Sequence, residues 1–491
     1  MRDAEEGAFA SGVEVEALMD KAGAGVALAI TKFFPNPGAC IVYAGKGHNA
    51  GDALVAAECL RRRGWKIEIR LAFKESDCSE LMRKKLESLR RAPDPWNRHL
   101  ADGTWAGSPC HTIILDGLLG LGAKPPLREP VRNACRRINR LRREENAYVF
   151  AVDLPTGIDG DSGKTDRDCV VADFTVAIGF AKPGLVADGA LNFVGRLEVA
   201  PLDELRPPEK KENEIVACAP ALRELLLPRN YAAYKNQFGR IGIVAGSKGF
   251  TGAAIMCSLG ALRAGAGLVE VFVPEEIYEI VAAAAPPEAM VKPVNSYRHL
   301  LKEKIDVWAL GPGLGKLRAD EILELIEKAR QPMVVDADGL NILSGKISTL
   351  KRCKGERLLT PHPGEMKRLF DNKKETRAKT ATKFCRRFPV ALLLKGSRTI
   401  VAERDQPLSY NTTGNPGMAT GGMGDILTGV CAGLIGQGLS LYDAARLGAW
   451  MCGRAAEMSL FYGHASEESL LPRDVLDCLG DALNELHNSA I

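Results

Sequence analysis

A glycine-rich segment near the C-terminal end carries the residues best suited to phosphate chemistry. It reads Asn415-Pro-Gly-Met-Ala-Thr-Gly-Gly-Met-Gly-Asp425 and leads directly into an apolar run that predicts a helix. Glycines at a helix N-terminus leave backbone N–H groups free at its positive end, which suits a phosphate group. Asp425 cannot bind phosphate itself, but it can take a proton from a hydroxyl that attacks a γ-phosphate. The alternative is that Asp425 only caps the helix after a flexible loop.

Three further polar turns each follow a predicted strand in the same half. They are Gly311-Pro-Gly-Leu-Gly315, Thr360-Pro-His-Pro-Gly-Glu365 and Lys395-Gly-Ser-Arg-Thr399. In open α/β sheets, ligands bind beyond the carboxyl ends of the strands, so these turns predict one continuous nucleotide site. His362, between two prolines, is expected to contact substrate rather than to transfer a proton. A fixed turn residue is the alternative for His362.

Two aspartates also stand at the end of a predicted strand, in the stretch Asp336-Ala-Asp-Gly-Leu-Asn341. Carboxylates at such a position can contact Mg²⁺ directly or through water. Two Asp residues at a strand end are, however, also ordinary loop caps. Asp336 and Asp338 are therefore not counted among the predicted site residues.

Three strand-end loops of the first half carry oxygen-bearing side chains. They are Ala44-Gly-Lys-Gly-His-Asn-Ala-Gly-Asp52, Leu115-Asp-Gly-Leu-Leu-Gly-Leu-Gly122 and Val152-Asp-Leu-Pro-Thr-Gly-Ile-Asp159. The first opens a helix, a position that suits phosphate, but it is neither a Gly-x-Gly-x-x-Gly motif nor a P-loop. Asn49, Asp116 and Thr156 supply hard oxygen ligands that could surround a monovalent cation. A set of tight turns with Asx caps is an equally good interpretation.

The elements that must hold these side chains alternate along the chain, which is typical of an α/β fold with a mostly parallel sheet. Strands are predicted in the first half at 40–44, 66–72, 112–115, 148–152, 174–178 and 197–199. Strands are predicted in the second half at 240–245, 268–273, 307–310, 333–335, 357–359, 391–394 and 399–402. Helices are predicted at 52–63, 131–143, 421–437 and 440–459.

Length and composition describe ordinary globular domains. The 491 residues suffice for two to four domains of roughly 100–200 residues each, and 46% hydrophobic and 26% charged residues are close to average. Two prolines in the charged stretch Leu205–Lys211 predict a domain boundary, which we set after Pro208. A formal charge of +4 gives no basic excess of the kind that nucleic-acid binding requires.

The cysteine pattern and the absence of long apolar runs bear on location. The 13 cysteines include no Cys-x-x-Cys pair, so no zinc knuckle or thioredoxin motif is present, and they suit free thiols in a reducing compartment. The first residues lack the apolar core of a signal peptide, and no run is long enough to span a bilayer. A cytoplasmic protein without a membrane partner is expected.

The second half resembles the ribokinase-like superfamily and, within it, the ADP/ATP-dependent NAD(P)H-hydrate dehydratases. The matching stretches, which cover nearly all of residues 215–491, are Lys235-Asn-Gln-Phe-Gly-Arg-Ile-Gly-Ile-Val-Ala-Gly-Ser247, Thr251-Gly-Ala-Ala, Arg263-Ala-Gly-Ala-Gly-Leu-Val, Asp336–Asn341, Thr360–Glu365 and Gly421–Asp425. The resemblance implies that hydrated NADH and NADPH (NADHX and NADPHX) lose their hydroxyl while Mg²⁺ and ADP or ATP supply a phosphate. AMP or ADP and phosphate would be the other products.

The same resemblance implies the roles of individual residues. Asp425 is the catalytic base that prepares the ring hydroxyl for phosphorylation. The nucleotide-binding residues implied are Lys395, Gly396, Ser397, Arg398, Thr399 and Gly424. The residues implied to line the hydrate site are Ala253, Gly313, His362 and Asp425.

Roughly residues 12–200 resemble the NAD(P)H-hydrate epimerases, which interconvert the R and S hydrates. The three strand-end loops carry this resemblance, together with Leu18-Met-Asp-Lys-Ala-Gly23 and Gly179-Phe-Ala-Lys-Pro-Gly184. It implies a Rossmann-like three-layer sandwich and a K⁺ site formed by Asn49, Asp116 and Thr156. The substrate-binding residues implied are His48, Asn49, Ala50, Gly51, Asp52, Gly120, Leu121, Gly122, Ala123, Lys124, Pro125, Pro126 and Asp153.

Together these patterns predict a homo-oligomeric repair enzyme with an epimerase domain at residues 1–208 and a ribokinase-like dehydratase domain at residues 209–491. One rival is a vitamin or sugar kinase, which would release a stable phosphoester and leave the first half unexplained. The other rival is a degenerate first half that acts only as a scaffold. It is motivated by His48, Ala50 and Ala53, which replace an Asn and two Gly of the family loop. The Ala50 methyl would crowd the loop if that residue required a positive φ.

Overall fold

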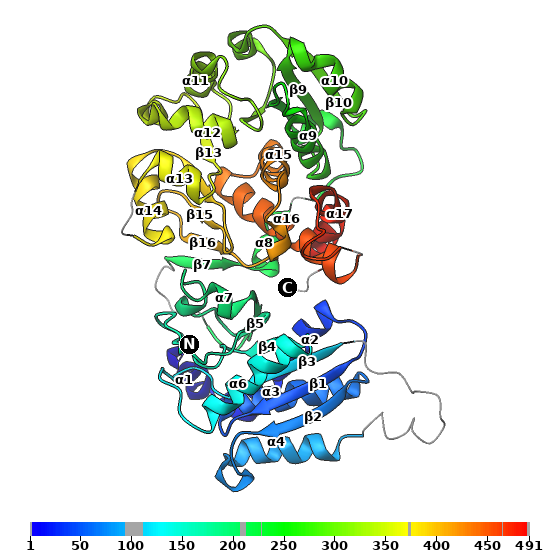
Figure 1. Ribbon diagram of the computed structural model, residues 1–491, viewed down its shortest axis with the longest axis vertical. Helices are drawn as coiled ribbons and strands as arrows, with labels where there is room; N and C mark the ends of the chain where they lie inside the picture. The colour runs from blue at the N-terminus through cyan, green and yellow to red at the C-terminus, as the bar shows by residue number, and fades with distance from the viewer. Residues whose placement is uncertain are drawn as a thin grey trace, which may run out of the picture. The chain divides into compact units, whose positions relative to one another are not determined.

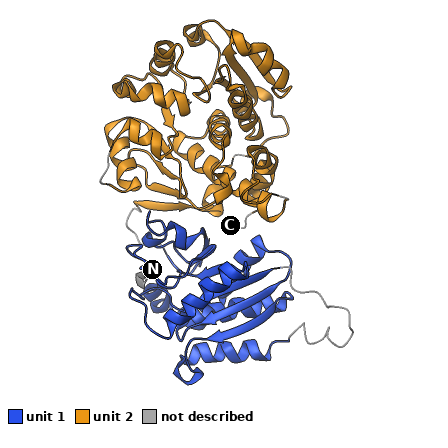
Figure 2. Ribbon diagram, in the orientation of Figure 1, with its two compact units in different colours: residues 1–211 blue, residues 212–491 orange. Residues whose placement is uncertain are grey.

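In the computed structural model the chain forms two compact units, residues 1–211 and 212–491 (Figure 2). The structure describes residues 2–93, 111–206, 213–226, 228–371, 375–463 and 465–488. The expected boundary after Pro208 lies outside the described residues. Among the described helices, none is both long and apolar enough to pass through a membrane.

The first unit is built on a parallel sheet with the strand order β2-β1-β3-β4-β5-β6 (Figure 1). All six strands predicted for this half are present, with ends that differ by at most two residues. They are β1 (Ala39–Ala44), β2 (Lys66–Leu71), β3 (Thr112–Gly117), β4 (Tyr148–Val152), β5 (Phe174–Ile178) and β6 (Arg196–Ala200). The strand order changes direction at β1: β2 lies on one side of it, and β3 to β6 follow on the other side. Ligands of open α/β sheets bind at such a switch point.

Helices cover both faces of this sheet, so the first unit has three layers. Side chains of a strand alternate between faces: Ile114 of β3 packs in the cluster of α6, while a Cβ at Gly117 would touch Ala53 of α3. α2 packs on α3 and contacts β5 and β6. The helices are α1 (Arg2–Ala10), α2 (Val15–Phe33), α3 (His48–Arg62), α4 (Glu80–Arg91), α6 (Val131–Glu144) and α7 (Leu191–Val194).

The second unit contains a larger sheet with the order β10-β9-β8-β11-β12-β13-β14-β15-β16-β7. Its strands are β7 (Glu214–Ala217), β8 (Arg240–Val244), β9 (Leu268–Pro274), β10 (Ala289–Val294), β11 (Val307–Leu310), β12 (Met333–Val335), β13 (Arg357–Leu359), β14 (Ala391–Leu394), β15 (Ile400–Ala402) and β16 (Leu408–Asn411). Only β15 runs antiparallel to its neighbours among the described strands. The sequence patterns did not predict β7, β10 and β16.

The second unit's sheet is also flanked by helices (Figure 1). They are α8 (Ala219–Arg223), α9 (Thr251–Arg263), α10 (Tyr278–Ala284), α11 (Ala319–Lys328), α12 (Ala337–Ser344), α13 (Pro363–Leu369), α14 (Arg377–Arg387), α15 (Met423–Gly436), α16 (Leu441–Phe461) and α17 (Pro472–Asn488). α9 and α15 pack unusually closely, because a Cβ at Gly429 would lie 2.0 Å from the Cys257 carbonyl oxygen. The predicted helices at 421–437 and 440–459 correspond to α15 and α16.

A buried ion pair lies inside the α16 layer. Arg454 is fully buried and donates to Glu457 one turn later at 3.0 Å and to Glu485 of α17 at 2.8 Å. The other carboxylate oxygen of Glu457 accepts from the Gly414 backbone N–H at 2.8 Å. Because Gly414 directly precedes the glycine-rich segment, this ion pair holds the start of that segment to the core.

Candidate active sites

Five turns of the second unit lie along one edge of its sheet, at the carboxyl ends of β8, β11, β12, β13 and β14. Backbone contacts join them: Gly246 N–H donates to the Pro312 carbonyl at 2.8 Å and Lys395 N–H to the Pro361 carbonyl at 2.8 Å. Gly311 has φ +129°, and a Cβ there would lie 1.8 Å from the Asp336 carbonyl oxygen. The turns that the sequence predicted to form one site are thus neighbours.

A polar cluster stands at the centre of this edge. The buried Asp336 accepts from Lys395 Nζ at 2.6 Å with one carboxylate oxygen and from Thr428 Oγ1 at 2.9 Å with the other. Glu365 Oε2 lies 4.0 Å from the same Lys395 nitrogen. The pKa of Lys395, which burial alone would lower, is raised overall by its contact with Asp336. The lysine therefore stays charged beside the glycine-rich segment.

Asp425 lies in the first turn of α15 and does not cap it. The N-cap position is held by Gly422, which has φ +96°, and no side chain of the described residues caps this helix end. The capping interpretation of Asp425 is therefore wrong. Burial, together with the negative charge of Asp336, raises the pKa of Asp425 to about 7, although Lys395 opposes the shift. A carboxyl group with a pKa near neutrality is suited to act as a general base.

The four residues predicted to line the hydrate site come from the turns after β11 and β13 and from the first turns of α9 and α15. Gly313 and Ala253 are adjacent, since a Cβ at Gly313, where φ is +62°, would lie 2.9 Å from the Ala253 Cβ. Ser247 Oγ holds this turn by donating to the Gly313 carbonyl at 2.7 Å. The side chains that line a pocket next to it are Ser247, Pro274, Glu275, Glu276, Tyr297, Leu314, Leu317 and Arg318.

His362 forms the N-cap of α13. Its Nδ1 accepts from the Gly364 N–H at 3.0 Å, and its own backbone N–H donates to Glu365 at 2.8 Å. The ring is thereby fixed in orientation with Nδ1 as an acceptor, and its side chain is half exposed. The turn-residue interpretation thus describes its structure, and the exposed edge of the ring remains available for contact with substrate.

The turn Lys395–Thr399 has a strained backbone. Arg398 adopts φ +87°, which is strained for a residue with a side chain and is typical of functional sites. Its buried guanidinium donates to the Thr412 carbonyl at 3.5 Å. The charged end of Arg398 is therefore turned away from the surface of the turn, where its backbone remains. A Cβ at Gly424 would lie 3.3 Å from both Lys395 Nζ and Asp336 Oδ2, which puts this glycine against the cluster.

Asp336 and Thr428 are cluster residues that the sequence analysis left out of the site. The two aspartates of the Asp336–Asn341 stretch did indicate a possible ligand site, but an Asp at the end of a strand is usually a loop cap. The two aspartates in fact differ: Asp338 accepts from the Gly315 N–H at 2.8 Å like an ordinary loop residue, whereas the Asp336 side chain makes no capping bond. Thr428 lies one turn after Asp425 on the same helix, at a spacing that faces the same way.

The three predicted cation ligands of the first unit come together. Thr156 Oγ1 donates to Asp116 at 2.7 Å, and its backbone N–H donates to the other oxygen of that carboxylate at 2.8 Å. Asn49 Nδ2 donates to the Leu119 carbonyl at 3.0 Å, and the Leu119 N–H donates to Thr156 Oγ1 at 3.2 Å. The start of α3, the end of β3 and the segment after β4 thus each bring one residue to the same point.

These residues have the chemistry that a monovalent cation requires. Asp116 is fully buried, and no cationic side chain of the described residues pairs with it. The Asn49 Oδ1 oxygen is buried without a hydrogen-bond partner among the described residues. A buried carboxylate without a counter-ion and an amide oxygen without a donor are both destabilising, and a bound K⁺ would satisfy both.

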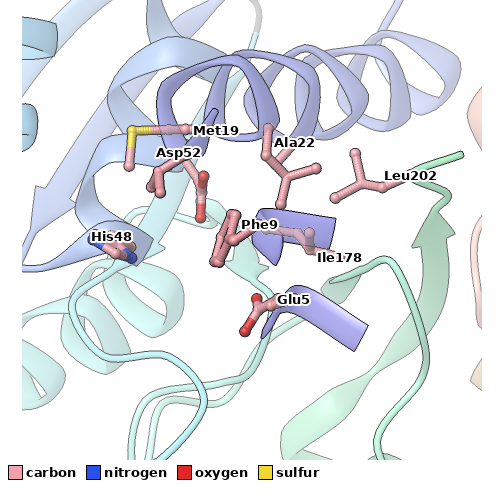
Figure 3. Close-up of a pocket in the computed structure, with 10 residues that line it drawn as sticks. Glu5, Phe9, Met19, Ala22, His48, Asp52, Ile178 and Leu202 are labelled. Atoms are coloured by element: carbon pink, nitrogen blue, oxygen red, sulfur yellow. The ribbon is translucent and has the colours of Figure 1, made fainter. Parts of the chain in front are cut away.

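A pocket of the first unit lies beside the predicted substrate loop. It is lined by Glu5, Phe9, Val15, Leu18, Met19, Ala22, His48, Asp52, Ile178 and Leu202 (Figure 3). Asp52 and Glu5 extend toward it from different helices (Figure 3). Burial, followed by the charges of Asp153 and Glu5, raises the pKa of Asp52 well above its usual value, although Lys182 opposes the shift. Of the predicted substrate residues, His48 and Asp52 thus line this pocket.

The other predicted residues of the first unit lie around these two features. Asp153 has φ +67° and forms a buried ion pair with Lys182, which the sequence analysis did not single out. Residues 120–126 do not line the pocket, although Gly120 packs against the Asn49 side chain. The Lys124 side chain in that loop forms an exposed ion pair with Asp161 at 3.4 Å.

Ala50 is fully buried within α3 and does not have a positive φ. The helix begins at His48, four residues before the predicted start, so this part of the loop is the helix's first turn. The crowding expected if Ala50 required a left-handed backbone therefore does not arise.

Two protein-family models match the chain. The model described as NAD(P)H-hydrate dehydratase matches residues 241–475, and the one described as YjeF-related protein N-terminus matches residues 15–184. The first range contains the whole Asp336 cluster, and the second contains the cation site together with His48 and Asp52.

Whole-length relatives are similar over both units. The bifunctional NAD(P)H-hydrate repair enzyme Nnr of Moorella thermoacetica is 35% identical over 96% of this chain and 92% of its own length. The protein of the same name from Escherichia coli K12 is 34% identical over 93% and 88%. Among solved structures, a ribokinase-like superfamily protein from Enterococcus faecalis matches 58% of this chain and all of its own at 25% identity, with a TM-score of 0.50.

Proposed function

The chain belongs to the family of bifunctional NAD(P)H-hydrate repair enzymes, which join an epimerase to a dehydratase, and on this premise we propose how its residues divide the two reactions. The first unit interconverts the R and S hydrates of NADH and NADPH. The second unit removes the hydroxyl of the S hydrate, with ADP or ATP as the phosphate donor. The observation that supports the proposal is a cluster of bonded polar side chains at the carboxyl ends of the strands in each unit.

In the dehydratase unit, Asp425 takes the proton of the ring hydroxyl, and the hydroxyl oxygen attacks the terminal phosphate of ADP or ATP, whose bridging P–O bond breaks to release AMP or ADP. The phosphate ester then leaves as inorganic phosphate, a ring proton is lost, and the conjugated dihydronicotinamide is restored. Lys395 neutralises charge on the transferred phosphate, and the N–H groups at the start of α15 bind it. Mg²⁺ bound with the nucleotide would neutralise further charge, and Asp336 is the carboxylate of the cluster available to it.

The dehydration rate is expected to rise with pH and to level off above about pH 7. The reason is that burial and the charge of Asp336 raise the pKa of Asp425 to about 7, and the base works only when ionised. A plot of log kcat/KM against pH should therefore have a slope of about one below the bend. A flat profile between about pH 5.5 and 8 would argue against a base with this pKa.

In the epimerase unit, Asn49, Asp116 and Thr156 would hold K⁺. The bound cation would supply a fixed positive charge at the end of the strands, where the phosphates of the substrate can approach it. The buried Asp116 carboxylate is then neutralised, and the start of α3, which carries His48 and Asp52, is held to the turns after β3 and β4 through Asn49.

Replacing Thr156 with Val is expected to raise the K⁺ concentration needed for half-maximal epimerisation by about 10- to 100-fold. The substitution keeps the shape of the side chain but removes the hydroxyl that bonds Asp116 and the Leu119 N–H. The K⁺ dependence of R-NADHX conversion measures the effect. Thr175→Val is a matched control, because the Thr175 hydroxyl is also buried and bonded, to the Val194 carbonyl at 2.7 Å. An equal response in both variants would argue against the cation site.

The test of the whole proposal is chromatography of a mixture of R- and S-NADHX incubated with the protein, Mg²⁺, K⁺ and either ADP or ATP. Loss of both epimers with recovery of NADH is the expected result, and it also identifies the phosphate donor. Loss of the S epimer alone would reduce the first unit to a scaffold. A stable phosphorylated product would favour a kinase.

A further inference from the structure

α1 forms part of the pocket wall in the first unit, although it precedes the residues that the epimerase-unit family model matches. That model begins at residue 15, whereas α1 spans Arg2–Ala10. Glu5 and Phe9 of α1 line the pocket together with Asp52 of α3 (Figure 3). The wall opposite the predicted substrate loop is therefore made by a segment to which no role has been assigned.

The two carboxylates of this pocket differ from the other carboxylates around it. Neither Glu5 nor Asp52 has an ion-pair or hydrogen-bond partner among the described residues, although both side chains are only partly exposed. Asp153 is instead paired with the buried Lys182, which also donates to the Ile178 carbonyl at 2.9 Å. Keeping two half-buried carboxylates unpaired lowers the stability of the fold, and such unfavourable arrangements are typical of functional sites.

Inversion at one carbon requires proton transfer on both faces of the ring that contains it. One group must donate a proton to the leaving oxygen, and a second group on the other side must accept a proton from the entering one. We propose that Glu5 of α1 and Asp52 of α3 are this acid–base pair of the epimerase, acting across the pocket on the hydroxyl-bearing ring carbon. This inference rests on the proposed epimerisation, and it adds a catalytic residue from α1.

In one direction, the proposed epimerisation removes the ring hydroxyl as water and then adds water to the opposite face of the same carbon. Asp52, as the carboxylic acid, gives its proton to the ring hydroxyl, the C–O bond breaks with its electron pair on oxygen, and water leaves. The lone pair of the adjacent ring nitrogen forms a C=N⁺ bond. A water molecule then adds to the opposite face of the carbon, and Glu5, as the carboxylate, takes the proton that this water releases. Starting from the other epimer, the same steps run in reverse.

Burial and nearby charges both shift the pKa values of the pair. Asp153 raises the pKa of Glu5 and of Asp52, and Lys182 lowers both, while the N-terminal ammonium and His48 also lower that of Glu5. Burial, followed by the charge of Asp153, raises the pKa of Glu5, and burial raises that of Asp52 more strongly. Because the pKa of both groups is raised, and that of Asp52 more strongly, the pocket favours Asp52 as the carboxylic acid beside Glu5 as the carboxylate.

The test compares Glu5→Gln with Glu6→Gln in the full-length protein. Glu6 is the next residue on α1 and is exposed, so its substitution changes the same charge without touching the pocket. We expect Glu5→Gln to lower kcat for conversion of R- to S-NADHX by 100-fold or more, with a smaller change in KM, and Glu6→Gln to behave as wild type. Dehydration of purified S-NADHX by each variant checks that the second unit is folded and active, and the pH profile below tests the first.

A pH profile separates a catalytic role from a structural one. The wild-type rate should fall at both low and high pH, and the residual activity of Glu5→Gln should lose one of these two limbs. Glu5→Asp should recover part of the rate, since it restores a carboxylate about one bond away. Equal rates for Glu5→Gln and Glu6→Gln would overturn the inference while leaving the epimerase itself intact. A wild-type protein without epimerase activity would instead refute the proposed function.

Discussion

Replacing Asp425 with Asn is expected to lower the dehydration rate by about 100- to 10,000-fold, the range typical for loss of a general base. Asn has nearly the shape of Asp, but it cannot take the proton of the ring hydroxyl. Nucleotide affinity should change little, because Lys395 and the N–H groups at the start of α15 are untouched. The measurements are single-turnover recovery of NADH from S-NADHX and calorimetric titration with ADP and with ATP.

Stability provides a control for this variant. The pKa of Asp425 is raised in the fold to about 7, so its ionised form destabilises the folded state increasingly as pH rises from the unfolded pKa to about 7. The neutral Asn removes this destabilisation, and at pH 8 the variant should be at least as stable as wild type. Asp481→Asn, at an exposed position of α17, is the matched substitution outside the cluster. Full activity of Asp425→Asn would remove Asp425 from the mechanism.

Replacing Arg454 with Met is expected to lower the free energy of unfolding of the second unit by about 3–5 kcal/mol. The substitution leaves the buried Glu457 carboxylate without its cation. Removing one partner of a buried ion pair is far more destabilising than replacing both partners with apolar residues. Hydrogen exchange of the α16 amides measures the loss. The slowest of these amides should exchange faster by about two to four orders of magnitude.

Two comparisons make this result specific. Arg473→Met removes an exposed arginine on α17 and should leave exchange unchanged. The amides of α2 in the first unit report on general unfolding and should also be unaffected. Dehydration should slow in Arg454→Met as well, because Glu457 accepts from the Gly414 N–H at the start of the glycine-rich segment. Unchanged exchange in α16 would mean that the ion pair contributes little to the unit.

Most of the strands could be predicted because they are short apolar runs bounded by turn residues. β7, β10 and β16 could not, and each has a physical reason. β7 and β10 are edge strands, and the Ala289–Val294 run includes Lys292 and Pro293, which an interior strand would exclude. β16 contains Ser409 and Asn411, whose side chains are buried by helix packing that no local pattern reveals.

The candidate sites were predictable where a motif fixes the backbone. Asp425 ends a glycine-rich segment and Lys395 opens the turn after a predicted strand, so both could be recognised from the sequence, and the structure places both beside Asp336. Glu5 and Lys182 could not be found this way, because their position in the pocket depends on how α1 and the segment after β5 fold back. The neighbouring residues in the sequence do not distinguish Glu5 or Lys182 from a charged residue on the surface.

The pairing of β7 with β16 has a consequence for the order in which the chain is made. β7 is the first strand of the second unit, yet its parallel partner spans Leu408–Asn411, and Glu214 pairs with Leu408. Its neighbour in the sheet is therefore synthesised after almost all of the other strands. A ribosome has completed the first unit by the time β7 emerges, so that unit can fold early. The newly made β7 must therefore wait, with an open edge, for most of the remaining chain, so its pairing with β16 is a late step in the folding of the second unit.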